Sequence, residues 1–423
     1  MVKVLKNPLF LSCLILSLLF YSGFVKVKKR ASFCTPAKKN EIVRLEGFVS
    51  GNPVKSAFYG SSYKTEFSVS KAFTKNGAFS ACGKLNLFFP SEFVEAFYPG
   101  KIYSSVSGKS CGGFLVESGA VLSVEVVHIQ KSEEISYLVK GGKSLGWKGG
   151  FLGAPFRKFR ALCRLQFKRL MYSWGEAGGL LLALLSGSRE YTEKSVSDAF
   201  RDSGLSHILA LSGMHLGLFG SLAHFFGKKA GGRNFGDALQ LGAVLFFVWF
   251  AGISPSLFRA FLAALILYLN SLFRMNRPDS LSLLSSCFLI HVMIFPAHIF
   301  EPAFMLSYSS LAGIILFGMF LRKVYPFFIP YRTRLSISDS TAAQIATSPV
   351  SIKIFGKIMP VGIAASLFVS PLVFLFLYLG LFGVMVCLVL PFLSGAFCDI
   401  MNLLYFLIKK FVLFFGNFRG IEF

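Results

Sequence analysis

The apolar segment at residues 201–220, RDSGLSHILALSGMHLGLFG, contains several side chains that can transfer protons or bind anions. A lipid-facing helix gains nothing from such groups, because polar side chains in hydrocarbon are costly unless they are paired or face a cavity. The segment therefore predicts the functional centre of a membrane-embedded pathway. The side chains that we expect to line it are Asp202, His207, Ser212 and His215.

Ser212 and His215 raise the question of nucleophilic chemistry. On a helix His207 and His215 share one face, and Ser212 lies within a turn of His215. A serine beside a histidine is the arrangement of an intramembrane serine hydrolase. However, Ser212 stands in LSG rather than in a G-x-S-x-G turn, and the sequence indicates no third residue to orient the histidine. We therefore expect a pore or helix-contact role, no catalytic residue and no enzyme; hydrolysis through Ser212 is the less favoured alternative.

A second polar group occurs in GISPSLFRA at 252–260, at the start of an apolar run. Its proline suits a helix N-terminus, whose free N–H groups can meet a phosphate. Ser256 and Arg259 are its candidate path residues. Arg259 has two interpretations: an ion pair with Asp202 or Glu301, or contact with a passing phosphate. A third apolar run, FMLSYSSLAG at 304–313, carries small polar residues that helix packing alone explains.

Composition restricts the class of protein. Of 423 residues 54% are hydrophobic and only 15% are charged, which is typical of a polytopic membrane protein and excludes an ordinary soluble enzyme. The formal charge of +24 arises partly from basic cytoplasmic loops. The remainder fits a polyanionic partner, and charge alone does not separate nucleic acid from anionic lipid.

Basic loops alternate with loops that lack Lys and Arg, and this alternation predicts the topology. Lys228, Lys229 and Arg233 follow the first span, Arg274 and Arg277 follow the third, and the loop from Arg322 to Lys357 follows the fifth. These loops should be cytoplasmic, which places the N-terminal region before residue 201 outside. The basic cluster at 26–30, after a retained anchor at 7–25, argues the other way. The expected spans are 205–226, 235–253, 256–272, 280–299, 302–321, 358–379 and 380–398, with a further apolar run at 400–416 inside a helical domain of 201–416.

Residues 40–135 have a different character, with short alternating segments separated by Gly, Pro, Ser and Asn. This pattern predicts a small external all-β domain, and five strands suit an OB-like barrel. Phe67 and nearby lysines would make either a surface that stacks on single strands or a barrel core with a solvated face. An external domain would allow a disulfide between Cys82 and Cys111, with Cys34 as a third candidate. The expected strands are 41–49, 64–70, 83–89, 101–107 and 119–128.

Residues 150–200 are expected to form amphipathic, interfacial helices. FRKFRALCRLQFKRLMYSW at 156–174 interleaves cations with apolar side chains. Such a helix lies in a membrane interface, or lines the mouth of a nucleic-acid path. Its candidate DNA contacts are Arg157, Arg160, Arg164 and Lys168.

The sequence contains no motif for a metal or a cofactor. No spacing of cysteines and histidines indicates a metal site, no H-E-x-x-H occurs, and no P-loop GxxxxGK[ST] is present. We therefore expect neither metal nor cofactor, and any ATP-driven motor must be a separate cytoplasmic protein.

Three motifs resemble one known family. SGLSHILALSGMHLGLF at 203–219, GISPSLFRA at 252–260 and PAFMLSYSSLAGI at 302–314 occur in the order and spacing of the ComEC family of competence proteins. The similarity covers roughly 150–390. It implies a polytopic α-helical membrane protein with an external OB-like β domain near the N-terminus, acting as an inner-membrane channel for single-stranded DNA during natural transformation.

The resemblance also implies partners beyond the DNA and the bilayer. These are a DNA receptor, a cytoplasmic motor and a nuclease. Many family members continue into a metallo-β-lactamase-like domain with an H-x-H-x-D-H motif that this sequence does not contain. Either strand degradation requires another protein, or this chain is a fragment or an incomplete relative. The alternative function from the residues alone is transport of a small anionic or lipid-linked solute.

Overall fold

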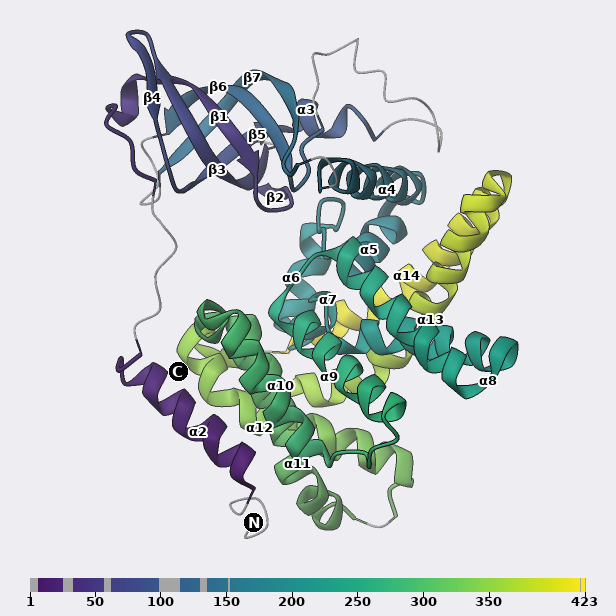
Figure 1. Ribbon diagram of the computed structural model, residues 1–423. Coiled ribbons are helices and arrows are strands. Elements are labelled where there is room, and N and C mark those ends of the chain that lie inside the picture. The colour runs from purple at the N-terminus through teal and green to yellow at the C-terminus, as the bar shows by residue number, and fades with distance from the viewer. Residues whose placement is uncertain are drawn as a thin grey trace.

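The computed structural model describes residues 7–25, 33–56, 62–98, 115–129, 135–150, 153–326, 328–418 and 420–422. A β domain stands at one end of a larger helical domain, and a basic helix runs along their junction (Figure 1). The fold class predicted from the sequence, a polytopic helical membrane protein with a small β domain near its N-terminus, is confirmed.

The β domain is a closed barrel of five strands. Its strands are β1 (Ile42–Val49), β3 (Ser62–Thr74), β5 (Lys84–Pro90), β6 (Ala120–Ile129) and β7 (Ser136–Trp147). They pair in the circular order β1-β3-β5-β7-β6-β1, and only the β5–β7 pair is parallel. A short helix, α3 (Ser91–Glu95), follows β5. This closed Greek-key barrel is an OB-like fold. Outside the barrel circuit are η1 (Lys39–Glu41), β2 (Val54–Ser56) and β4 (Gly77–Ser80).

Three sequence predictions about the barrel need comment. The fifth strand is β7, so the domain continues to Trp147 rather than ending at 135. Gly141 and Gly142 weaken the strand pattern there, and Gly142 is needed because a Cβ would lie 2.6 Å from the Ser123 carbonyl oxygen. The strand expected at 101–107 lies outside the described residues. Of the two interpretations of Phe67, a stacking surface or a barrel core, the structure supports the core, because the residue has 0% exposure.

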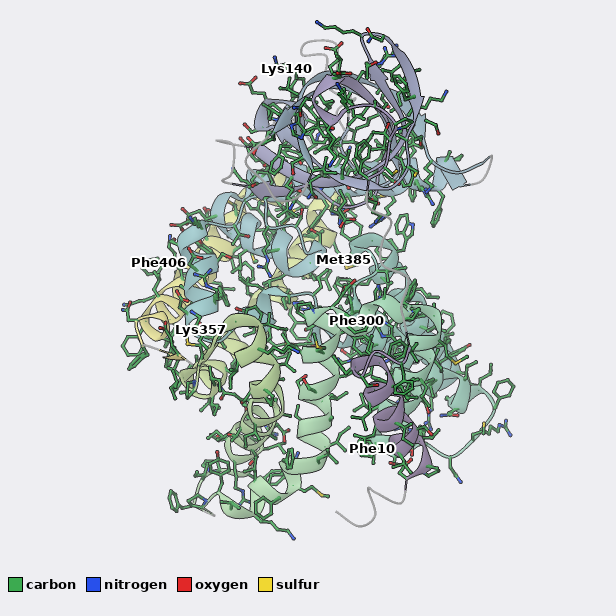
Figure 2. All side chains as sticks on the ribbon, turned by 90° about the vertical axis from the view of Figure 1, so that its left-hand side faces the viewer. Phe10, Lys140, Phe300, Lys357, Met385 and Phe406 are labelled. Atoms are coloured by element: carbon green, nitrogen blue, oxygen red, sulfur yellow. The ribbon has the colours of Figure 1, made fainter. Side chains whose placement is uncertain are left out.

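The N-terminal helix α2 (Pro8–Tyr21) packs on the helical domain rather than on the barrel. Asn7 donates to Ser282 Oγ (2.9 Å), and the Tyr21 hydroxyl donates to the Ile299 carbonyl (3.4 Å). Since Ser282 is near the start of α10 (Ser280–Ile294) and Ile299 follows its end, α2 runs parallel to α10. Figure 2 shows Phe10 of α2 far from Lys140 of the barrel.

The helical domain begins with the basic helix α4 (Gly153–Ser173) and with α5 (Gly175–Ser186). Every residue from 177 to 186 is buried, so α5 lies inside the domain, whereas the sequence predicted an interfacial helix there. Two short helices, α6 (Lys194–Asp202) and α7 (Ser206–Leu209), then lead to α8 (Gly213–Ala251).

Helix α8 is a hairpin of two arms. Gly231 and Gly232 have non-helical backbone, and Gly227 faces Gly236 so closely that a Cβ on Gly227 would lie 2.8 Å from the Gly236 Cα. Small residues permit this close packing of helices in a membrane. The two predicted spans at 205–226 and 235–253 correspond to these arms, and the reversal brings residue 213 and residue 251 to the same end.

The remaining helices are α9 (Pro255–Leu272), α10, η2 (Pro296–Phe300), α11 (Pro302–Val324), α12 (Tyr331–Phe355), α13 (Val361–Val389), η3 (Pro391–Leu393) and α14 (Ser394–Gly416). A two-stranded ladder pairs β8 (Lys357–Ile358) with β9 (Ile421–Glu422). Among the described residues, α8, α9, α11 and α13 are long and apolar enough to cross a membrane. Figure 2 places Phe406 of α14 at the outer side of this domain, where its 60% exposure suits a lipid-facing side chain.

Two predictions about the spans and their loops were wrong. Residues 358–379 and 380–398 were expected as separate spans, but α13 is one helix across Gly380. That glycine marks close packing, since a Cβ would lie 2.6 Å from a methyl of Leu181. Residues 322–357 were expected as a cytoplasmic loop, but they contain α12. This helix lies along α11, where a Cβ on Gly313 would meet the Ala342 carbonyl at 2.5 Å.

Candidate functional site

The N-terminus of α8 brings Ser212 and His215 together. Ser212 has extended backbone and is the residue before the helix. Its backbone N–H donates to His215 Nδ1 (3.2 Å), and its Oγ lies 3.1 Å from the same nitrogen. His215 has 1% exposure. The sequence spacing thus correctly predicted the contact, and the local cause is a reciprocal cap at a helix start.

This geometry is poorly arranged for hydrolysis. Because Nδ1 accepts a backbone N–H, the proton of the neutral ring is on Nε2. Nε2 is buried and has no hydrogen-bond partner among the described residues, so no carboxylate orients the ring as in a serine hydrolase. The pair therefore acts structurally as a cap and leaves one buried donor unused.

Arg259 reaches this helix start from α9. Its Nη1 donates to the Ser307 carbonyl of α11, and its guanidinium carbon lies 6.0 Å from the centre of the Tyr308 ring. A Cβ on Gly213 would lie 3.2 Å from Arg259 Nη2, so the cation stands beside the first residue of α8. Within the described residues Arg259 forms neither predicted ion pair, with Asp202 or with Glu301, and Asp202 instead pairs with Lys357 (3.0 Å).

We call Ser212, His215 and Arg259 the span-end cluster. The cluster lies where the start of α8 meets the first turns of α9 and α11. In the described part of the chain no carboxylate lies within ion-pair distance of Arg259. Ser256, a turn before Arg259, donates to the Ala303 carbonyl (3.3 Å). His207 is exposed on α7, whereas Asp202 lies on α6 against the Lys357 segment.

The cations of α4 have a different role from the one expected. Arg164 Nε lies 3.1 Å from a Glu117 oxygen, and Lys168 Nζ lies 2.7 Å from the other oxygen and 3.0 Å from Glu190. All four side chains are at most 2% exposed. The prediction that Arg164 and Lys168 offer a DNA surface is therefore wrong, because buried acids from distant parts of the chain neutralise them.

We call Glu117, Arg164, Lys168 and Glu190 the junction cluster. Glu117 precedes β6 of the barrel, and Glu190 lies between α5 and α6. Arg164 also donates to the Phe250 carbonyl at the end of α8 (2.9 Å). The Tyr98 hydroxyl donates to Glu190 (2.9 Å) and Ser188 donates to the other Glu190 oxygen (2.6 Å). The cluster therefore fastens barrel, basic helix and α8 together.

Electrostatics in the junction cluster favours the charged forms. Burial alone would raise the pKa of Glu117, but Lys168 and Arg164 outweigh it and hold that pKa below its ordinary value of 4.5. Burial likewise opposes charge on Lys168, yet Glu117 and Glu190 raise its pKa above 10.5. The ion pair between Glu117 and Lys168 is consequently present at neutral pH.

Two further basic side chains of α4 stay outside these pairs. Arg157 is half-buried, and its side chain packs beside Gly119, where a Cβ would lie 2.9 Å from Arg157 Cδ. Arg160 is also half-buried and donates one long hydrogen bond to the Phe250 carbonyl (3.4 Å).

Some polar groups packed against the candidate spans were missed by the sequence reasoning. His291 on α10 bridges the Tyr308 hydroxyl (3.2 Å) and His298 Nδ1 (3.0 Å) and is completely buried. On α12, Thr341 and Ser348 bond back to carbonyls of their own helix. A serine- and threonine-rich pattern without strong apolar periodicity does not indicate a helix beside α11, whereas the His291 contacts arise from chain segments that only the fold brings together.

The structure also changes the disulfide prediction. Cys111 lies outside the described residues. Cys34 and Cys82 exchange two backbone hydrogen bonds, of 2.9 and 3.0 Å, and both are exposed. Among the described residues no group of three or more His, Cys, Asp or Glu side chains could hold a metal ion.

Comparison with known proteins places this architecture in a family. Residues 184–422 match the family model described as "Competence protein". ComE operon protein 3 of Bacillus subtilis is 25% identical over 199 residues, which cover 46% of this chain and 25% of that protein. An uncharacterized protein of Aquifex aeolicus is 30% identical over 239 residues, which cover 56% of this chain and 54% of that protein.

The matches therefore span about a quarter of the first relative and about half of the second. No solved structure matches the chain significantly. The family model covers more than half of the chain, including α8, α9 and α11 with the span-end cluster. The chain belongs to the competence-protein family.

Proposed function

We propose that this protein is an inner-membrane channel through which single-stranded DNA passes into the cytoplasm during natural transformation. Family membership and the membrane-spanning helices support a role in DNA uptake. The observation that carries the channel proposal is Arg259, a cation within a candidate membrane span that has no acidic partner among the described residues and stands beside the first residue of α8. A cation and a helix start together suit a phosphate.

The proposed orientation places the barrel outside the cytoplasm. Positive-inside alternation assigns the Arg274–Arg277 loop before α10 to the cytoplasm. Because α2 runs parallel to α10, the start of α2 is then cytoplasmic and its end is external. This direction of α2 supports the topology predicted from the downstream basic loops, rather than the one indicated by the basic cluster at 26–30. The barrel that follows α2 would then be external.

The proposed path starts at the external end of α8 and α9. Ser212, His215, Ser256 and Arg259 would meet the strand first, with His207 and Asp202 further along. Beyond them α12 offers a polar helix at the depth of α11, with no Asp, Glu, Lys or Arg between Asp339 and Lys353. Neutral hydroxyls whose bonds are satisfied within the helix hold a polyanion weakly, which suits conduction, because the strand must also leave.

The proposed collecting surface lies on the barrel. Lys71 and Lys75 are exposed on β3 and its turn, and Arg44 stacks over the half-buried Phe73 ring at 4.2 Å. Cations beside an aromatic ring are the usual means of holding a single strand. A DNA receptor, a cytoplasmic ATP-driven motor and a separate nuclease belong to the same proposal as partners.

The proposal is tested by transformation with labelled DNA in the host, scoring surface-bound and cytoplasmic label separately. Arg259→Ala and His215→Leu should accumulate surface DNA and lose cytoplasmic label by more than tenfold at normal protein levels in the membrane. Arg277→Ala, which removes an exposed arginine near the other end of α9, is the matched control and should import normally. Unchanged import in Arg259→Ala would contradict the channel proposal and favour transport of a small anionic or lipid-linked solute.

The contact between Ser212 Oγ and His215 Nδ1 keeps hydrolysis as the second candidate. Ser212→Ala distinguishes the two, because a channel needs no nucleophile. We expect DNA import in this variant to stay within about threefold of wild type, since only a helix cap worth about 1 kcal/mol is lost. Import abolished at normal protein level by Ser212→Ala, but restored by Ser212→Thr, would instead favour nucleophilic chemistry.

A further inference from the structure

Arg160 has an unusual environment for a half-buried arginine. It makes one hydrogen bond, at 3.4 Å, to the Phe250 carbonyl, and its Nε is buried without a partner in the described structure. Arg164, which is 1% exposed, donates to the same carbonyl and has an unpartnered Nη2. Two guanidinium groups therefore share one carbonyl oxygen and leave buried donors unused, which is a costly arrangement.

Charge at this place is also unbalanced. Among the described residues the acids that act on Arg157, Arg160, Arg164 and Lys168 are Glu117 and Glu190, so these four cations exceed the acids by two positive charges. Burial first, and then repulsion by Arg164, lower the pKa of Arg160 to about 10, so the group is still charged at neutral pH. Gly252, with φ of 103°, lacks the Cβ that would lie 3.2 Å from Arg160 Nη2. The absence of a side chain at Gly252 therefore leaves space for the Arg160 guanidinium group.

Exposed aromatic rings surround the same place. The Trp249 ring near the end of α8 stacks on Phe159 of α4 (5.9 Å, 25°) and contacts Phe156 (5.2 Å) and Phe246 (5.6 Å). The three phenylalanines are each more than half exposed. Trp249 Nε1 has no partner among the described residues. Aromatic rings grouped at the end of a membrane span are typical of the bilayer interface.

We propose that Arg160 and Arg164, with Trp249 beside them, form a binding site for the phosphate of an anionic phospholipid headgroup, and that the aromatic rings contact its acyl chains. The phosphate would accept from the unused guanidinium donors and neutralise part of the charge excess. The site goes beyond the proposed channel, because its ligand belongs to the membrane and is not transported.

A lipid fits this site better than a DNA strand. The cations lie at the end of α8, where a span meets the interface, and the exposed rings are phenylalanines that present apolar surface outward. An amphipathic basic helix such as α4 lies in an interface and attracts anionic lipids. A lipid held there would also stabilise the connection between α4 and α8.

The test uses the full-length purified protein in mixed micelles with brominated phosphatidylglycerol or brominated phosphatidylcholine, which quench nearby tryptophan fluorescence. Phosphatidylglycerol should quench at about tenfold lower concentration than phosphatidylcholine, the ratio given by one charge-assisted contact. Arg160→Gln should abolish this preference, and Trp249→Phe should remove the quenching itself. Lys158→Gln, which loses an exposed cation of the same helix, should keep the preference.

Three results would overturn the proposal. One is equal quenching by both lipids in the wild type, and another is equal loss of the preference in Lys158→Gln and Arg160→Gln. The third is a labelled single-stranded oligothymidine that binds the wild type and loses binding in Arg160→Gln while lipid quenching is unchanged, which would assign the site to nucleic acid. Transformation assays on Arg259 variants are independent of these results, so failure here leaves the channel proposal intact.

Discussion

The junction cluster and the span-end cluster are both buried, but they differ in whether their cations have acidic partners. In the junction cluster Glu117 and Glu190 face Arg164 and Lys168 at 2.7–3.1 Å, and hydroxyls of Tyr98 and Ser188 add two hydrogen bonds to Glu190, although Arg164 Nη2 has no partner among the described residues. In the span-end cluster Arg259 has a carbonyl and a ring, and His215 Nε2 has no partner within the described structure.

We interpret this difference as a structural role for the junction cluster and a functional role for the span-end cluster. A buried charge that is paired and hydrogen-bonded holds chain segments together, whereas an incompletely paired group at a protein's interior is retained at a cost. The junction cluster connects three segments. The span-end cluster keeps donors available at a helix start, where a phosphate would supply the acceptors that the protein omits.

The largest expected effect is on the junction cluster. Glu117→Gln leaves Arg164 and Lys168 buried with one acid fewer, and breaking a buried pair in this way costs about 3–5 kcal/mol. We expect the thermal unfolding midpoint of the detergent-purified protein to fall markedly, with cleavage between barrel and α4 in limited proteolysis. Fluorescence-detected size exclusion after heating provides the measurement.

The control for this variant is Glu125→Gln, which removes an exposed carboxylate from β6 of the same barrel. It should leave the midpoint unchanged, because exposed charges contribute little. If both variants unfold at the wild-type temperature, the junction cluster does not stabilise the docked barrel, and the comparison between the two clusters fails.

Acid should weaken the same cluster. The folded-state pKa of Glu117 lies below its ordinary value of 4.5, so its stabilising contribution is complete above pH 4.5 and is lost as the pH falls through the folded value. Lys168 has the opposite shift, and its contribution is lost only as the pH rises above 10.5. Unfolding midpoints measured from pH 7 down to pH 3 should therefore fall less steeply in Glu117→Gln than in wild type. Parallel curves would contradict this assignment.

A smaller effect is expected at Cys34 and Cys82, which tests the side on which the barrel lies. Residues that exchange two backbone hydrogen bonds have Cα atoms about 5.5 Å apart, within the range that a disulfide spans. In an external barrel the pair should oxidise and add about 2 kcal/mol. Alkylation with a mass-labelled maleimide before and after reduction should show two protected thiols, and Cys34→Ser should expose Cys82. Full labelling of both thiols in unreduced cells would place the barrel in the cytoplasm.

Local sequence signals predicted the parts of the molecule that depend on neighbouring residues. Alternation along β1, β3, β5 and β6 was sufficient to predict a barrel, and a separation of three residues was sufficient to bring Ser212 to His215. The glycines at 231 and 232 allow the reversal that the predicted loop between two spans required.

Pairing over long distances could not be predicted in the same way. Arg164 and Lys168 read as a charged helix face because Glu117 is 47 and 51 positions away, and a periodic pattern carries no information about such partners. Arg259 and Ser307 are 48 positions apart and meet only because α9 packs against α11. Helix α12 was missed since its serines and threonines satisfy themselves internally and leave a polar sequence that resembles a loop.

The smallest expected effect on stability is at Arg259. Arg259→Gln removes a cation that has no acidic partner in the described structure, so no opposite charge is stranded and only a hydrogen bond to a carbonyl is weakened. The free energy of unfolding should change by no more than about 1 kcal/mol, far less than in Glu117→Gln. The same heating and size-exclusion assay compares the two variants side by side. A loss in Arg259→Gln as large as in Glu117→Gln would mean that the arginine is a structural element like those of the junction, and would remove the reason for assigning its unused donors to a phosphate.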